Sequence, residues 1–189
     1  VRYVDINGDG KINHDDQVPI GYSNFPEIMY GISLGGSYKN LDISLLFQGA
    51  THVSNMPSRR IMRGFYEYTG ANRDLLKSWS YERFVNNQKI VYPRYGVNGV
   101  GHNYLTSTYW LEDASYLRLK NVEVGYTFRQ ESLKKAGIGS IRIYVNGSNL
   151  LTWTDMLPGQ DPEVANAGVT NSEPYPVTRV FNFGLNVNF

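Results

Sequence analysis

The last nine residues, FNFGLNVNF, alternate between bulky apolar side chains and small polar ones. Apolar residues occupy the odd positions from Phe181 to Phe189, and asparagine or glycine occupies the even positions. Successive side chains of an extended chain point to opposite sides, so this pattern predicts a strand with one apolar face. In a soluble sandwich that face packs on a second sheet, whereas in a membrane barrel it meets lipid.

Two runs near the start of the chain alternate in the same way. Residues 30–38 carry apolar side chains on even positions, and residues 41–47 carry them on odd positions. The change of parity between two closely spaced runs predicts a hairpin that turns at Lys39-Asn40.

Two further runs, residues 121–128 and 141–153, predict two more strands. The connector between them, residues 129–140, is short and contains a predicted helical turn. Upstream of the first run, Leu117 and Leu119 have the opposite parity to the apolar residues that follow. This flip indicates that the strand either leaves a bilayer-like environment there or carries a bulge.

Parity divides the strand residues into two faces. In a barrel the apolar face would contact lipid, and its members are Ile32, Leu34, Ile43, Leu45, Val124, Ile143, Val145, Leu185, Val187 and Phe189. The polar face would point to the lumen or to a plug, and its members are Ser33, Ser44, Glu123, Arg142, Asn146 and Asn186.

Two long stretches, residues 51–113 and 154–178, show no sustained alternation. Loops of this length inside a folded domain are usually functional. Aromatic and arginine side chains dominate contact surfaces, so the candidates for contact with a ligand or partner are Arg59, Arg60, Arg63, Trp79, Tyr92, Tyr95 and Trp110. Packing of the same side chains within the loop is an equally open interpretation.

The connections alternate between short and long, as they do in bacterial outer-membrane barrels, where the short turns are periplasmic and the long loops extracellular. The apolar positions also end in two groups of aromatic residues. One group is Tyr38, Phe128 and Phe189, and the other is Tyr30, Phe47 and Trp153. We therefore divide the chain into a loop region, residues 1–28, and one incomplete domain of strands and loops, residues 29–189.

Composition narrows the class further. The 189 residues are 41% hydrophobic and 14% aromatic, which indicates a folded chain, and they include 15 Tyr and no Cys. A net charge of +1 gives no indication of a nucleic-acid partner. No apolar run approaches the roughly 18 residues that a membrane-spanning helix needs. The chain opens on VRYVDINGDG without a signal peptide, so we expect a fragment of a longer protein.

The first motif, DINGDGKINHDD at residues 5–16, has the spacing of a calcium-binding loop. The predicted ligands are the side chains of Asp5, Asn7, Asp9 and Asp16 and the carbonyl of Lys11, with Asn13 at the variable position. An Asp rather than a Glu closes the loop, and no amphipathic helix flanks it. A turn rich in Asp, Asn and Gly that needs no ion is the alternative.

The sequence gives no support for an enzyme. Residues 31–35 read GISLG and match the G-x-S-x-G pattern, but Ser33 lies inside an alternating run rather than at a strand-to-helix turn. The three histidines, His14, His52 and His102, have no metal-ligand spacing, and the carboxylates form no acid and base pair.

Taken in order, the motifs resemble the C-terminal part of the barrel of SusC/RagA-like TonB-dependent outer-membrane transporters. The segments that carry the resemblance are DINGDGKINHDD, YGISLGGSYKNLDISLLFQGA, YWLEDASYLRLKNVEVGYTF, SLKKAGIGSIRIYVNGSNLLTWT, the triplet Asp161-Pro162-Glu163 and FNFGLNVNF. The terminal aromatic residue also resembles the assembly signal of bacterial outer-membrane barrels.

The resemblance implies an all-β fold, namely the last antiparallel strands of a plugged transmembrane barrel of about 22 strands with long extracellular loops. It also implies import of glycan fragments or oligopeptides across the outer membrane of a Gram-negative bacterium. The implied partners are a SusD-like surface lipoprotein, the plug and other strands of the same transporter, the TonB complex and outer-membrane lipid. A secreted calcium-dependent β-sandwich that binds carbohydrate or mediates adhesion is the alternative.

Overall fold

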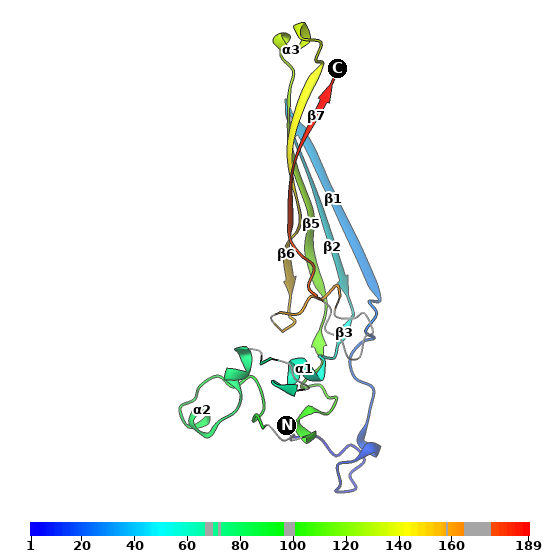
Figure 1. The fold of residues 1–189 in the computed structure, drawn as a ribbon. Helices are drawn as coiled ribbons and strands as arrows, with labels where there is room; N and C mark the ends of the chain where they lie inside the picture. The colour runs from blue at the N-terminus through cyan, green and yellow to red at the C-terminus, as the bar shows by residue number, and fades with distance from the viewer. Residues whose placement is uncertain (67–69, 72, 97–100, 158, 165–174) are drawn as a thin grey trace. The chain divides into compact units, whose positions relative to one another are not determined.

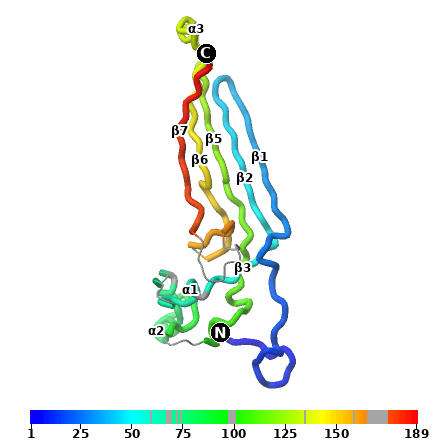
Figure 2. Tube along the Cα trace, turned by 45° about the vertical axis from the view of Figure 1, so that its right-hand side comes forward, coloured from blue at the N-terminus to red at the C-terminus, as the bar shows by residue number. Residues whose placement is uncertain are grey.

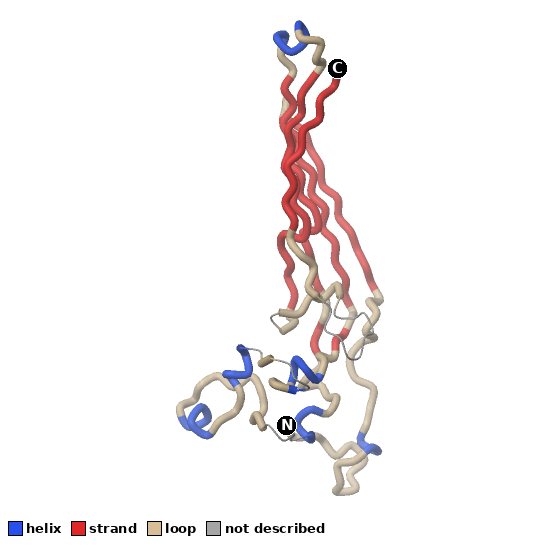
Figure 3. The backbone as a smooth tube through the Cα atoms, viewed as in Figure 1, coloured by secondary structure: helices blue, strands red, loops and turns tan. Residues whose placement is uncertain are grey.

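Five long strands form one antiparallel sheet in the structure, a computed structural model that describes residues 1–189 except 67–69, 72, 97–100, 158 and 165–174 (Figure 1). The strands are β1 (Ile28–Tyr38), β2 (Leu41–Thr51), β5 (Tyr116–Phe128), β6 (Ser140–Thr154) and β7 (Val180–Asn188). They lie side by side in the order β1-β2-β5-β6-β7 and are continuous along their length (Figure 3). The five strands and the hairpin predicted from alternation are confirmed.

Shorter elements lie between the long strands. They are the 3-10 helix His14–Asp16, β3 (Ser54–Asn55), α1 (Arg59–Met62), the 3-10 helix Arg73–Lys77, α2 (Tyr81–Val85), the 3-10 helix Gly101–Tyr104, β4 (Glu112–Asp113) and α3 (Glu131–Lys135). The predicted helical turn in the connector after β5 is α3. Within the described ranges, none of the helices has the length and apolar character needed to cross a membrane.

The described residues separate into two units. The sheet unit contains the described residues of 23–54, 113–168 and 174–189, and the loop unit contains those of 1–22 and 55–112. The structure therefore groups the N-terminal segment with the long loop, whereas a division at residue 28 assigns that loop to the strand region.

The register of the sheet places each predicted set of side chains on one face. Ile32 pairs with Phe47, Ile43 with Val124, and Val145 with Phe183, so the apolar positions continue across all five strands. On the opposite face Ser44 pairs with Glu123, and Glu123 pairs with Asn146. Ser33 lies in the middle of β1, which is the strand context that argued against a catalytic elbow.

A bulge in β5 explains the change of parity near Leu119. The register with β2 shifts between Leu46 and Phe47, and the register with β6 shifts between Leu119 and Asn121. The extra residue returns Leu117 and Leu119 to the apolar face, opposite Trp153 and Leu151. The register shifts confirm the bulge that the sequence indicated.

One row of the apolar face crosses four strands, with Tyr30 on β1, Gly49 on β2, Leu117 on β5 and Trp153 on β6. The ring of Tyr30 lies over Gly49, and its hydroxyl donates a hydrogen bond of 3.2 Å to the carbonyl of Tyr116. A Cβ atom at position 49 would lie 2.4 Å from that ring and 2.5 Å from the same carbonyl. This position therefore requires glycine.

The two short connections and the C-terminus lie at one end of the sheet (Figures 1 and 2). Lys39 and Asn40 join β1 to β2, and a connector that contains α3 joins β5 to β6. The long connections leave from the other end, where Val53, Ala114 and Met156 form a small buried cluster. The buried core of the sheet unit is therefore near the long connections and not under the apolar face.

Candidate functional site

The polar face of the sheet carries a buried ion network, which we call the Arg118 cluster: Arg118, Lys120, Asp161 and Glu163. Only 2% of the Arg118 side chain is exposed, and its guanidinium lies 2.5 Å from Asp161 and 2.6 Å from Glu163. Lys120 Nζ lies 2.6 Å from Glu163. Two cations and two carboxylates neutralise one another, which buried charges require.

Position along β5 explains why two basic side chains of this cluster meet one carboxylate. Arg118 lies just before the bulge and Lys120 is its extra residue, and both side chains reach Glu163. Arg118 Nε also donates a hydrogen bond of 3.0 Å to Thr152 Oγ1 on β6. The carboxylates come from the connection after β6, more than 40 residues further along the chain.

A second ion network lies on the same face, which we call the Arg142 cluster: Asp42 on β2, Glu123 on β5 and Arg142 on β6. The guanidinium of Arg142 contacts both carboxylates, with 2.8 Å to Glu123. Asn146 extends the network, because its amide donates to Glu123 at 3.4 Å and its carbonyl accepts from Asn182 at 2.8 Å. The polar face is thus hydrogen-bonded across strands β2 to β7.

Glycine makes room for Arg142 to cross the sheet. A Cβ atom at Gly125 of β5 would lie 2.3 Å from the guanidinium of Arg142. The side chain therefore passes over β5 and reaches Asp42 on β2. Similarly, the ring of Tyr144 lies over Gly184 of β7 and stacks below Arg142, whose guanidinium is 5.0 Å from the ring centroid.

The loop unit has a core of aromatic rings. Trp110 is 4% exposed, and its ring centroid lies 5.8 Å from those of Tyr104 and Tyr92 and 5.1 Å from that of Tyr109. The indole N–H donates to the carbonyl of Asn103 at 2.8 Å. Burial raises the pKa of the Tyr104 and Tyr109 hydroxyls.

The contact candidates in the long loop divide between this core and its surface. Tyr92 and Trp110 are buried, so the structure favours packing over contact with a partner for these two. Arg63 lies 4.7 Å from the ring centroid of Tyr104, and Tyr95 donates to the carbonyl of Gly64. Trp79 is 38% exposed.

The two remaining candidates, Arg59 and Arg60, begin α1, and the side chain of Arg59 lies outside the described part of the structure.

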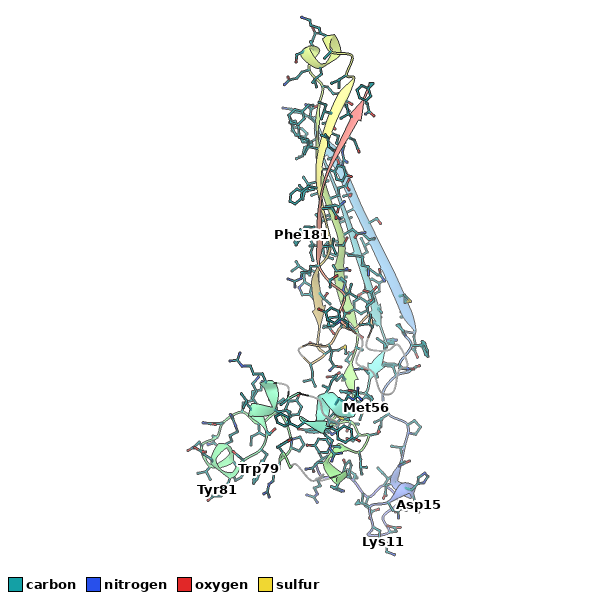
Figure 4. All side chains as sticks on the ribbon, viewed as in Figure 1. Lys11, Asp15, Met56, Trp79, Tyr81 and Phe181 are labelled. Carbon is teal, nitrogen blue, oxygen red and sulfur yellow. The ribbon has the colours of Figure 1, made fainter. Side chains whose placement is uncertain are left out.

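Exposed apolar side chains that sequence reasoning missed lie on α2. Tyr81 is 74% exposed, Phe84 62% and Val85 57%. Their spacing of three and four residues places them on one side of a helical turn. The signal was present in the segment YERFV, but a single turn is too short for a helical period to be recognised in the sequence. Figure 4 labels Tyr81, the first residue of α2, and Trp79, which lies two residues before it.

The calcium-like loop is closed by hydrogen bonds to its own backbone. Asp5 accepts from the amides of Gly8 and Gly10 at 2.7 and 2.8 Å, and Asp16 accepts from Ile6 and Asn13 at 2.7 and 2.9 Å. These donors, first Asn13 and then Ile6, hold the pKa of Asp16 below its usual value.

The oxygens of this loop are also the predicted calcium ligands. Over the described residues, no group of three or more His, Asp or Glu side chains is arranged to hold a metal ion. Asn7 and Asp9 each accept an amide two residues further on, as in an Asx turn, and Lys11 and Asp15 lie on the same loop (Figure 4). Calcium binding by Asp5, Asn7, Asp9, Lys11, Asn13 and Asp16 stays a prediction.

The sequence was compared with protein-family models and with known proteins. No protein-family model matches the chain. TonB-dependent receptor P26 of Formosa agariphila is 34% identical over an alignment that covers 100% of this chain and 19% of that receptor. TonB-dependent receptor SusC of Bacteroides thetaiotaomicron is 26% identical, with 99% of this chain and 17% of SusC covered.

A solved structure shares the fold. The RagAB peptide importer in its closed-closed state matches with a TM-score of 0.71 and 26% identity, covering 99% of this chain and 20% of the matched chain. The chain thus spans about a fifth of the length of the proteins that it matches. With its two-faced antiparallel sheet, it belongs to the SusC-like TonB-dependent transporters.

Proposed function

We propose that this chain forms part of the outer-membrane wall of a TonB-dependent transporter, with its five long strands crossing the bilayer. The observation that carries the proposal is the register, which collects the apolar side chains on one uncovered face. Ile32 is 51% exposed, Val145 39% and Phe183 82%, although each is paired with a neighbouring strand and lies away from the ends of its own strand. The strands have 9 to 15 residues, and a membrane-spanning strand needs about 9–11.

The sheet does not support the β-sandwich alternative. A sandwich buries its apolar face against a second sheet about 10 Å away. Among the described residues, the second sheet consists of β3 and β4 alone, with two residues in each strand. Lipid provides the missing cover in our proposal.

Open edges support the same conclusion. Among the described strands, β1 pairs only with β2, and β7 pairs only with β6. Each edge strand has a row of backbone N–H and C=O groups without partners in the sheet, and such unpaired groups are unfavourable in hydrocarbon. The remaining strands of the transporter would complete the pairing and close the barrel.

We place the short connections and the C-terminus on the periplasmic side and the long connections outside the cell, as bacterial barrels have them. The transporter imports glycan fragments or oligopeptides, and the TonB complex supplies energy through parts of the protein beyond this chain. The name of the RagAB peptide importer and the glycan or peptide cargo of the resembled family support this choice.

A SusD-like lipoprotein is the proposed partner at the extracellular mouth. Exposed aromatic and aliphatic side chains mark interaction surfaces, and Tyr81, Phe84 and Val85 form such a surface on α2. Replacement of Phe84 by Asp should reduce the amount of lipoprotein recovered with the tagged intact transporter. Glu82→Gln, on the same helix, is the control, and equal recovery from both variants would contradict this contact.

Spin labels on two adjacent residues test the membrane proposal directly. In the intact transporter in lipid vesicles, a nitroxide at Ile43 should be more accessible to oxygen, and one at Ser44 more accessible to a water-soluble nickel complex. The two residues are adjacent in β2, so they lie at nearly the same depth in the bilayer and differ only in the face to which they point. If the label at Ile43 is shielded from oxygen and immobilised, a second sheet covers the apolar face and the sandwich replaces the barrel.

A further inference from the structure

The connection between β6 and β7 is fastened to the sheet at both of its limbs. Asp161, in the outgoing limb of residues 159–164, accepts three hydrogen bonds. They come from Arg118 at 2.5 Å, from the amide of Glu163 at 3.0 Å and from the amide of Val177 at 3.0 Å. Val177 belongs to the returning limb, residues 175–179. One carboxylate therefore joins β5 to both limbs.

The burial of this junction makes it hard to break. Arg118 is the largest fully buried side chain among the described residues, and the Asp161 side chain is 7% exposed. Removal of one partner leaves the other charge buried without compensation. Glu163 is half-buried and binds both Arg118 and Lys120, so it adds a second attachment for the outgoing limb.

We propose that the Arg118 cluster locks both limbs onto the polar face, so that they form a fixed lining of the transport path. Arg118 and Lys120 are positioning residues in this view, because they act through the limbs that they hold. The lining half of the proposal rests on the proposed function, which makes the polar face the inner wall. The lock half depends only on contacts within the sheet unit.

Hydrogen exchange of the intact transporter, measured by mass spectrometry, tests the lock. Arg118→Met should raise amide exchange in both limbs by roughly tenfold or more, because a buried charge loses its partner. Arg129→Met, an exposed arginine just after β5, is the matched control and should leave both limbs unchanged. Unchanged exchange in Arg118→Met would overturn the lock.

Glu163→Gln covers the case in which Arg118→Met fails to assemble. It keeps the bonds of Asp161 to Arg118 and Val177 and weakens only the second attachment. Exchange should therefore rise in residues 159–164 and stay unchanged in residues 175–179. Unchanged exchange in both limbs would contradict the second attachment through Glu163, and an equal rise in both would contradict the arrangement in which Asp161 holds the returning limb.

Susceptibility of cells to vancomycin, a large polar antibiotic that intact outer membranes exclude, tests the lining. At equal amounts of transporter in the membrane, Arg118→Met and Glu163→Gln should lower the inhibitory concentration relative to Arg129→Met. Raised exchange with unchanged susceptibility would overturn the lining and leave the lock. Failure of the membrane proposal itself would appear separately, in the spin-label test on Ile43 and Ser44.

Discussion

The sheet unit and the loop unit use their apolar side chains in opposite ways. In the sheet, apolar residues define the strands by alternation but remain exposed, as Phe183 does at 82%. In the loop unit, Tyr92 and Trp110 show no period in the sequence, yet they are 1% and 4% exposed. Alternation therefore reports backbone structure, whereas burial depends on which rings meet in three dimensions.

This contrast separates two sources of stability. The sheet is held together by backbone hydrogen bonds, and its stability also depends on the medium around it. Exposure of its apolar face is favourable in lipid and unfavourable in water. Packed rings stabilise the loop unit through apolar area removed from water. Substitutions that remove a buried ring from the loop unit, or place a charge on the apolar face of the sheet, test this contrast.

The largest expected effect is in the loop unit. Trp110→Ala removes the ring at the centre of the aromatic core and should lower the free energy of local opening by about 3–5 kcal/mol. Native-state hydrogen exchange of the intact transporter measures this quantity. Trp79→Ala, at a residue that is 38% exposed, should cost much less, and equal costs would show that the ring cluster is not the core.

The next largest effect is on the apolar face of the sheet. Val145→Lys, near the middle of β6, should destabilise the transporter by about 2–4 kcal/mol in lipid vesicles, because a charge would enter hydrocarbon. Asn146→Lys, one residue along on the polar face, should be tolerated. Urea unfolding in vesicles gives both values. A larger cost at Asn146 than at Val145 would reverse the assignment of the two faces.

A smaller effect is expected at glycines of the sheet. Gly49→Ala should cost about 1–3 kcal/mol, because the new Cβ would overlap the Tyr30 ring and the backbone of Tyr116. Gly36→Ala on β1 has no atom within 4 Å of the new Cβ and should be close to neutral. The same unfolding assay compares them, and similar costs at both positions would contradict the close packing of Tyr30 over β2.

The smallest effect is expected in the exposed loop of residues 5–16. Asp16→Asn removes one carboxylate oxygen that accepts backbone amides, so amide exchange at Ile6 and Asn13 should rise. The folded-state pKa of Asp16 is lowered, so its stabilising contribution is present above the ordinary aspartate pKa and is lost as the pH falls through the lowered value. In wild-type transporter, the protection of the loop amides, measured relative to their intrinsic exchange rates at each pH, should likewise fall on acidification.

Calcium gives the same loop a separate test. If the predicted ligands bind the ion, added calcium should slow exchange in residues 5–16 relative to a chelator, and Asp9→Asn should abolish the difference. Identical exchange with calcium and with chelator would leave the backbone hydrogen bonds as the complete explanation of the closed loop.

Local patterns in the sequence were sufficient for the strands, the hairpin and the membership of each face, and they marked the place of the bulge. These features depend on neighbours one or two residues apart and on a period of two, which a sequence displays directly. The lists of residues on the apolar face and on the polar face follow from the same period. The sequence also placed Ser33 inside a strand, since the surrounding alternation continues on both sides of it.

Only the tertiary structure decided the role of the long connections. Arg118 meets Asp161 and Glu163 across 43 and 45 residues, and Trp110 meets Tyr92 within a loop that has no period. No local sequence pattern predicts such pairs, because each contact depends on where the chain lies after a long connection. The sequence by itself determined which residues line each face of the sheet, and tertiary contacts determined which charges and rings are buried, since burial depends on neighbours that are distant in the chain.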